Sequence, residues 1–198
     1  MATESRIEGA MSLAEFLAWP RIDEKPYLEY HDGRIEVNES SMLRRGLLKS
    51  RLAQAVCDFA RPRSLGMAFM ALRCTFGSWS IVPDLVFLDR AKITTDERGR
   101  VVDGPVAQPD LHAEIHAIDR LKGRTVEKIE HSLRHGCPLG WFLDPDQRSV
   151  GVYRPGRAVE VLGLDGVLDG DPVLPGFRLA VAEVFGWLTY RKPKADPS

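Results

Sequence analysis

Two acidic residues stand out because each interrupts an apolar run that is typical of a buried β-strand. Asp84 lies in the run VPDLVFL, and Glu114 lies in DLHAEIHA. A lone carboxylate in a hydrophobic layer is costly, so such groups are usually paired, hydrogen-bonded or bound to a cation. Hard carboxylate oxygens suit Mg²⁺ or Mn²⁺. If the two strands are neighbours, we expect Asp84 and Glu114 to share one divalent ion and so support hydrolysis of a phosphodiester.

A lysine lies where it can assist that chemistry. Lys128 is near the start of the helix expected after the Glu114 strand, close to where the chain must turn back. A long ammonium side chain can orient the attacking water or stabilise the charge of the transition state. Taken alone, Lys128 is more typical of an ordinary solvated helix lysine, because Glu127 and Glu130 beside it are typical of a charged helix face.

A basic cluster marks the long helix that the apolar spacing predicts from residue 41 to about 61. Its members are Arg44, Arg45, Lys49 and Arg51. Such side chains can contact the phosphates of DNA. A solvated helix face is the commoner outcome for a run of this kind, and the sequence alone slightly favours it.

The histidines offer a different metal site. Four of the five form two His-x-x-x-His pairs, His112 with His116 and His131 with His135. Histidines at helical spacing can chelate zinc, but neither a Cys-x-x-Cys nor a His-Glu-x-x-His pattern accompanies them, so core packing and surface positions are favoured. The sequence also has no Gly-x-Ser-x-Gly elbow, phosphate-binding Walker loop or dinucleotide fingerprint, which leaves serine hydrolases and nucleotide-binding enzymes without support.

The elements that must position these groups follow from hydrophobic periodicity and turn residues. In the first half we expect a capped helix over 12–20, a hairpin around Asp32-Gly33, the helix over 41–61, and extended segments over 67–76 and 79–88. A charged loop over 89–109 follows, with at most a short strand at 101–102. After it we expect the Glu114 strand, a helix over 124–135, a strand in GWFLDPD, further strands and a short closing helix. One mixed β-sheet flanked by helices is the simplest α/β (α+β) architecture for this order.

Composition fits a folded globular chain that lies in the cytoplasm. Of the 198 residues, 44% are hydrophobic and 28% are charged, and the three cysteines are unpatterned, as in a reducing compartment. The first ten residues lack the apolar stretch of a secretory signal, and no apolar run approaches the roughly 18 residues that span a bilayer. The net charge of −1 argues modestly against a nucleic-acid partner, although a local basic groove remains compatible with it.

The motifs resemble those of the Uma-two family of restriction endonucleases, a branch of the PD-(D/E)XK nuclease superfamily. The resemblance rests on VPDLVFL, EIH and EKIEHSLRHGCPLGWFLDPD, and it extends to SLAEFLAWP, YLEYHDGRIEV and VLPGFRLAVAEVF, roughly residues 11 to 187. It implies a restriction-endonuclease-like fold, DNA as substrate, Mg²⁺ or Mn²⁺ as cofactor and a homodimer. We expect a flexible N-terminus over 1–10, a single restriction-endonuclease-like domain over 11–188 and a polar tail over 189–198.

The resemblance also assigns roles to single residues. Asp84 and Glu114 match the two metal ligands of the family, Lys128 matches a lysine that has moved to the adjacent helix, and Glu29 occupies the place of a family acid near the site. His116, close to Glu114, is an additional site candidate that the resemblance does not supply. Some supporting positions depart from the family pattern, namely His116, Ala117, Ser132, Leu139 and Gly140. This drift leaves open a second hypothesis, a catalytically inactive protein that keeps the fold and binds nucleic acid or dimerises.

Overall fold

The computed structural model describes residues 7–8, 11–38, 42–117 and 122–190, and within them the largest element is a six-stranded mixed sheet. Its strand order is β11-β10-β9-β8-β7-β4. The bounds are β4 (Gly66–Met70), β7 (Leu85–Asp89), β8 (Leu111–Ile115), β9 (Leu139–Asp144), β10 (Ser149–Tyr153) and β11 (Glu160–Leu162). β8 and β9 are parallel, and the other neighbouring strands are antiparallel. The predicted mixed sheet flanked by helices is confirmed.

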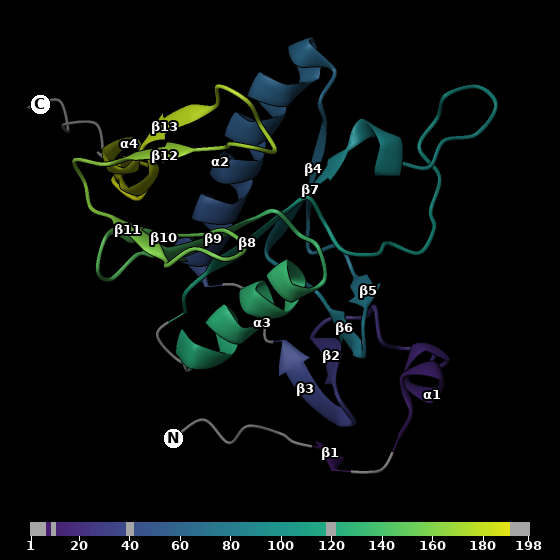
Figure 1. Ribbon diagram of the computed structural model, residues 1–198. Helices are drawn as coiled ribbons and strands as arrows, with labels where there is room; N and C mark the ends of the chain where they lie inside the picture. Colours follow the sequence, from purple (N-terminus) through teal and green to yellow (C-terminus); the bar gives the residue numbers. More distant parts are fainter. Residues whose placement is uncertain (1–6, 9–10, 39–41, 118–121, 191–198) are drawn as a thin grey trace, which may run out of the picture.

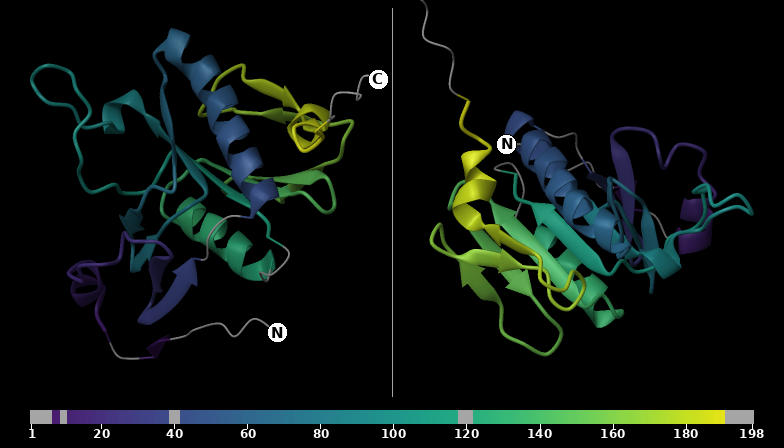
Figure 2. Two further views of the ribbon diagram at one scale, coloured as in Figure 1. Left: turned by 180° about the vertical axis from the view of Figure 1, so that it is seen from behind. Right: turned by 90° about the horizontal axis from the view of Figure 1, so that it is seen from above.

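Two helices cover opposite faces of this sheet, α2 (Leu43–Ala60) on one and α3 (Lys122–Arg134) on the other (Figure 1, Figure 2). The apolar side of α2 packs on alternate residues of the central strands, such as Trp141 of β9. The intervening residue of β9, Gly140, faces Ile129 of α3. The helices predicted over 41–61 and 124–135 are thereby confirmed, and residue 41 itself lies outside the described residues.

A second, antiparallel sheet lies at one end of the large sheet, next to α3 (Figure 1). Its order is β1-β3-β2-β6-β5, with bounds β1 (Ile7–Glu8), β2 (Tyr27–His31), β3 (Arg34–Asn38), β5 (Cys74–Phe76) and β6 (Trp79–Ile81). The β2–β3 hairpin turns at Asp32 and Gly33, which both have positive φ, as predicted. The short helix α1 (Leu13–Leu17) begins with the predicted capping box of Ser12 and Glu15.

The prediction of two continuous extended segments over 67–76 and 79–88 is wrong. The chain leaves the large sheet after β4, forms the β5–β6 hairpin of the second sheet, and returns at β7. The hydrophobic pattern does not mark these breaks because apolar residues such as Ala71, Leu72 and Val82 continue through them. Ala71, at the first break, has a left-handed φ of 52°. Asp84, at the second, directly precedes β7 instead of lying in the middle of a strand.

The remaining elements are two short 3-10 helices and a C-terminal part that packs on the side of the large sheet that α2 covers. They are the short helices η1 (Arg61–Arg63) and η2 (Arg90–Lys92), the two-stranded sheet of β12 (Val167–Asp169) and β13 (Arg178–Ala180), and α4 (Val181–Gly186). In the loop over 89–109, the predicted short strand is reduced to a single bridge between Thr95 and Val101. The expected end segments 1–10 and 189–198 lie mostly outside the described residues. Within the described part of the chain, every helix is too short or too polar to cross a bilayer.

Gly140 sets how closely α3 approaches the sheet. A Cβ at this position would lie 2.3 Å from Cγ2 of Ile129, whose side chain is fully buried. We expect Gly140→Ala to push α3 outward and to lower the free energy of unfolding by about 1–3 kcal/mol, as overpacking usually does. Urea denaturation measures this change.

Gly123→Ala, in α3 itself, is the control. Gly123 is exposed, and a Cβ there would meet no atom within 4 Å. Because alanine favours a helix over glycine, this substitution should raise the free energy of unfolding by roughly 0.5–1 kcal/mol. Equal effects of the two substitutions would show that Gly140 has no packing role.

Candidate functional site

The two candidate acids lie side by side on neighbouring strands. Leu85 of β7 is opposite Ala113 of β8, and one step further along the ladder Asp84 comes beside Glu114. The backbone N–H of Ile115 donates to Oδ2 of Asp84 at 2.9 Å, which fixes this register. Asp84 is 2% exposed and Glu114 is 1% exposed. The condition that sequence reasoning set for a shared cation, namely that the two strands are neighbours, is met.

Asp84 is held by two cations from the first turns of α2. Arg45 donates through Nε to Oδ2 at 2.9 Å, its Nη2 lies 2.8 Å from Oδ1, and Nζ of Lys49 also lies 2.8 Å from Oδ1. Arg45 is buried and Lys49 mostly so, because residues four apart share one side of a helix. The interpretation of this cluster as a solvated helix face is therefore wrong for both residues. Arg44, by contrast, is half exposed and pairs with Asp146 at 2.9 Å.

Glu114 has one occupied oxygen and one bare oxygen. Its Oε1 lies 2.6 Å from Nζ of Lys128 and 3.0 Å from Nε2 of His112. Its Oε2 is buried and has no hydrogen-bond partner among the described residues. Burial alone would raise the pKa of Glu114, but the Lys128 ammonium and the hydrogen bond from His112 outweigh it and lower the pKa to about 2. The carboxylate is therefore ionised at neutral pH.

Lys128 bridges the two sheets. Besides Glu114 of the large sheet, its Nζ contacts Oε1 of Glu29 in β2 at 2.9 Å. Glu29 also accepts from the backbone N–H of Val82 at 2.7 Å and from Nδ2 of Asn38 at 2.9 Å. Burial opposes ionisation of Glu29, but the charge of Lys128 keeps the pKa of Glu29 far below its ordinary value. Lys128 is only 4% exposed, so the alternative of a solvated helix lysine is wrong.

Sequence reasoning missed the hydrogen-bonding role of His112. Its ring joins two elements, because Nε2 contacts Glu114 and Nδ1 contacts Oγ of Ser132 in α3 at 2.6 Å. The signal was available, since residues two apart in a strand point to the same face. His116, the other additional site candidate, is buried beyond the end of β8, where its ring packs against Phe142.

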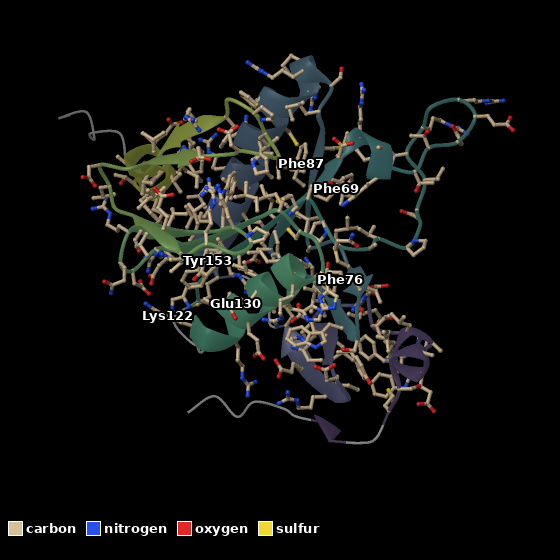
Figure 3. All side chains as sticks on the ribbon, in the orientation of Figure 1. Phe69, Phe76, Phe87, Lys122, Glu130 and Tyr153 are labelled. Atoms are coloured by element: carbon tan, nitrogen blue, oxygen red, sulfur yellow. The ribbon has the colours of Figure 1, made fainter. Side chains whose placement is uncertain are left out.

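The second histidine pair belongs to an aromatic stack between α3 and the second sheet. The ring of His131 lies parallel to the ring of Trp79, with 4.0 Å between centroids, and it also stacks on Phe76. Figure 3 shows Phe76 beside α3. On the opposite strand, His31 stacks on the same Trp79 at 4.3 Å. His135 packs against His131 at 4.2 Å. Among the described residues, no three His, Cys, Asp or Glu side chains are grouped to hold a metal, so the zinc alternative gains no support.

The acid pair fits a hard divalent cation. Mg²⁺ is usually held by only one or two carboxylates, with water and substrate oxygens completing the shell. Asp84 and Glu114 supply these two carboxylates, and the bare Oε2 of Glu114 is a buried acceptor that a cation would satisfy. Asp84 would have to exchange its contacts with Arg45 and Lys49 for the cation.

Comparison with known proteins gives a consistent result. The model of the Uma2 family, described as "Putative restriction endonuclease", matches residues 13–182. The crystal structure of a "putative nuclease belonging to DUF820" from Anabaena variabilis ATCC 29413 superposes with a TM-score of 0.85 and 30% sequence identity, covering 90% of this chain and 99% of that one. No curated protein matches the chain.

The buried ion pairs of Lys128 can be tested by stability. Lys128→Met removes the cation between Glu29 and Glu114 and leaves two buried carboxylates without it. Breaking a buried pair in this way should lower the free energy of unfolding by about 3–5 kcal/mol. Adding Glu29→Gln to Lys128→Met should restore part of that loss. A loss below about 1 kcal/mol in the single variant would contradict the bridge.

His131 gives the stability a pH dependence. Burial lowers the pKa of His131 from 6.5 to about 4. As the pH falls from 6.5 towards about 4, His131 binds a proton in the unfolded chain but not in the folded protein. The free energy of unfolding therefore falls in this range. His131→Phe keeps the ring stack on Trp79 and should flatten this part of the curve. Parallel curves for parent and variant in urea denaturation would refute the assignment.

Proposed function

We propose, from the premise that this chain belongs to the Uma2 family of restriction-endonuclease-like nucleases, that it is a Mg²⁺- or Mn²⁺-dependent endonuclease that hydrolyses phosphodiester bonds in DNA. The observation that carries the proposal is the pair of buried carboxylates of Asp84, directly before β7, and Glu114, beside it in β8, with a lysine 2.6 Å from the second. The nuclease fold is common to the family, whereas the DNA substrate, the metal and the residue roles belong to the proposal.

Asp84 and Glu114 would hold the cation. The chemistry that it supplies when bound is neutralisation of phosphate charge and a lowered pKa for a coordinated water. Glu114 is suited to this part because it is ionised and keeps Oε2 bare. Glu114 is in turn oriented by His112, which Ser132 anchors through Nδ1. Such an anchored partner fixes the orientation of a ligand and strengthens it.

Lys128 would act as the cationic hydrogen-bond donor of the reaction. Its Nζ is fixed between Glu29 and Glu114, so it has a defined position and direction. From this position it can donate to an attacking water or to a phosphate oxygen whose negative charge grows in the transition state. Glu29 then acts on Lys128 and not on the substrate, which gives the additional site candidate a positioning role.

The remaining expectations belong to the same proposal. They are one domain over residues 11–188, a homodimer and a cytoplasmic location. The homodimer rests on the family resemblance. The cytoplasmic location is consistent with Cys57, Cys74 and Cys137 being free thiols.

A second candidate function is an inactive nuclease-fold protein that binds nucleic acid. The observation in its favour is that both oxygens of Asp84 are already in ion pairs or hydrogen bonds with Arg45, and one of them also with Lys49. Calorimetric titration with Mn²⁺ separates the two candidates. Micromolar binding that disappears in Glu114→Gln supports the enzyme, whereas DNA binding without any Mn²⁺ affinity supports the inactive protein.

Plasmid cleavage in Mg²⁺ or Mn²⁺ tests the proposed activity. We expect Asp84→Ala and Glu114→Gln each to reduce the rate at least about a hundredfold, because each removes a ligand of the cation that activates water. Removal of divalent ions by a chelator should stop cleavage of plasmid by the parent protein.

Asp96→Ala is the matched control. Asp96 is also paired with an arginine, Arg100 at 2.7 Å, but it lies in the exposed loop over 89–109. This variant should cleave at the parent rate. Equal cleavage rates for Asp84→Ala and the parent protein would contradict the proposed role of Asp84 as a metal ligand.

A further inference from the structure

A cavity of about 210 Å³ opens beside Asp84, between the first turns of α2 and the segment that leads into β2. Its lining includes three cationic side chains, Lys25, Arg45 and Lys49. Among the described residues that line it, Asp84 is the single acid, so these residues carry an excess of two positive charges. We call this cavity the Lys25–Lys49 pocket. An excess of that sign and size indicates an anionic ligand.

The size of the pocket limits which ligands it can hold. It is much larger than the roughly 30 Å³ that one water occupies, and smaller than the roughly 300–1,000 Å³ of sites for whole small molecules or cofactors. A phosphate group with part of its sugar is of the appropriate size. Tyr27, half buried on the wall, adds an aromatic surface against which a sugar or base can pack.

Arg45 and Lys49 have enough N–H donors to bind a phosphate while each keeps a contact with Asp84. The contacts of Arg45 with Asp84 use Nε and Nη2, and Nη1 carries two further N–H donors. Lys49 uses one contact to Asp84 out of the three donors on its ammonium group. Arg45 is 5% exposed, so its guanidinium acts from a largely dehydrated position, where charge-assisted hydrogen bonds are strong.

We propose that the Lys25–Lys49 pocket binds a backbone phosphate of the DNA strand that lies across Asp84 and Glu114. The identity of the ligand as DNA rests on the proposed function, whereas the pocket itself rests on its charge and size. Lys49 and Arg45 hold the phosphate from the α2 side. Lys25, which is exposed at the rim, contacts it from the opposite wall.

The pocket also explains how Asp84 becomes available to a divalent cation. A cation at Asp84 would meet Arg45 and Lys49, which lie 2.8 Å from the same Oδ1. A phosphate in the pocket offers these two side chains another acceptor, so that Asp84 can release them. Phosphate and Mn²⁺ should therefore strengthen each other's binding, and the coupling is reciprocal.

Calorimetric titration of the full chain with a deoxynucleoside bisphosphate tests the pocket without any cleavage. We expect Lys49→Ala to weaken binding about tenfold, because it removes one charge-assisted contact. Lys92→Ala is the matched control, since Lys92 also pairs with an aspartate, Asp110 at 2.9 Å, outside the pocket. It should bind like the parent protein. Equal affinity of Lys49→Ala and the parent, or equal weakening in Lys49→Ala and Lys92→Ala, overturns the proposal.

Two further measurements complete the test. Lys25→Ala changes an exposed side chain, so the fold tolerates it, and it too should weaken bisphosphate binding. Saturating Mn²⁺ should tighten bisphosphate binding at least about fivefold in the parent protein. Parent-like affinity of Lys25→Ala removes this lysine from the pocket. An affinity that Mn²⁺ leaves unchanged overturns the exchange at Asp84.

Failure of the pocket and failure of the proposed function give different results. If cleavage requires Asp84 but Lys49→Ala binds the bisphosphate like the parent, the pocket is overturned and the nuclease activity stands. If Asp84→Ala cleaves like the parent while Lys49→Ala loses bisphosphate affinity, the pocket stands and the proposed mechanism does not.

Discussion

The contact of Lys128 with two carboxylates is the interaction on which the rest of the site depends. Glu29 belongs to the second sheet and Glu114 to the large one, and both contact the ammonium group of Lys128, which α3 carries. An ion buried to this degree is stable only if its partners stay in place. The position of α3 against both sheets is therefore fixed by charge as well as by apolar packing. The same contacts orient the ammonium group of Lys128, which can donate hydrogen bonds.

Charge balance extends this constraint to the whole site. Three buried carboxylates, on Glu29, Asp84 and Glu114, face three cations, on Arg45, Lys49 and Lys128. The set is neutral as it stands. A divalent cation would add two positive charges, which a low-dielectric environment disfavours unless anions enter as well. The phosphates of a DNA strand are such anions, so the proposed metal and substrate sites are electrostatically complementary.

The sequence allowed much of this arrangement to be predicted because its strongest signals are local. The capping box at Ser12, the Asp32-Gly33 turn and the spacing of the two main helices each depend on neighbouring residues, and each is confirmed. The pairing of Asp84 with Glu114 followed from their similar strand contexts and from the family order. The division into two sheets could not be predicted, because the apolar runs through residues 67–88 continue across the breaks.

The environment of the charged residues was also beyond local reasoning. Arg45 and Lys128 have the sequence neighbourhood of solvated helix residues, and both are buried because acids from other elements lie opposite them. The contact of Arg45 with Asp84 spans 39 residues, and that of Lys128 with Glu29 spans 99. Pairings over such separations depend on tertiary structure, which hydrophobic periodicity does not encode.

The wide spacing of Glu29, Asp84, Glu114 and Lys128 along the chain has a consequence during synthesis on the ribosome. The second sheet and the α2–β7 part emerge long before Lys128 does, so a growing chain carries acids without their lysine. The complete set of groups is present only after α3 has docked between both sheets. Under the proposed chemistry, an unfinished or half-folded copy is therefore harmless to the nucleic acids around it.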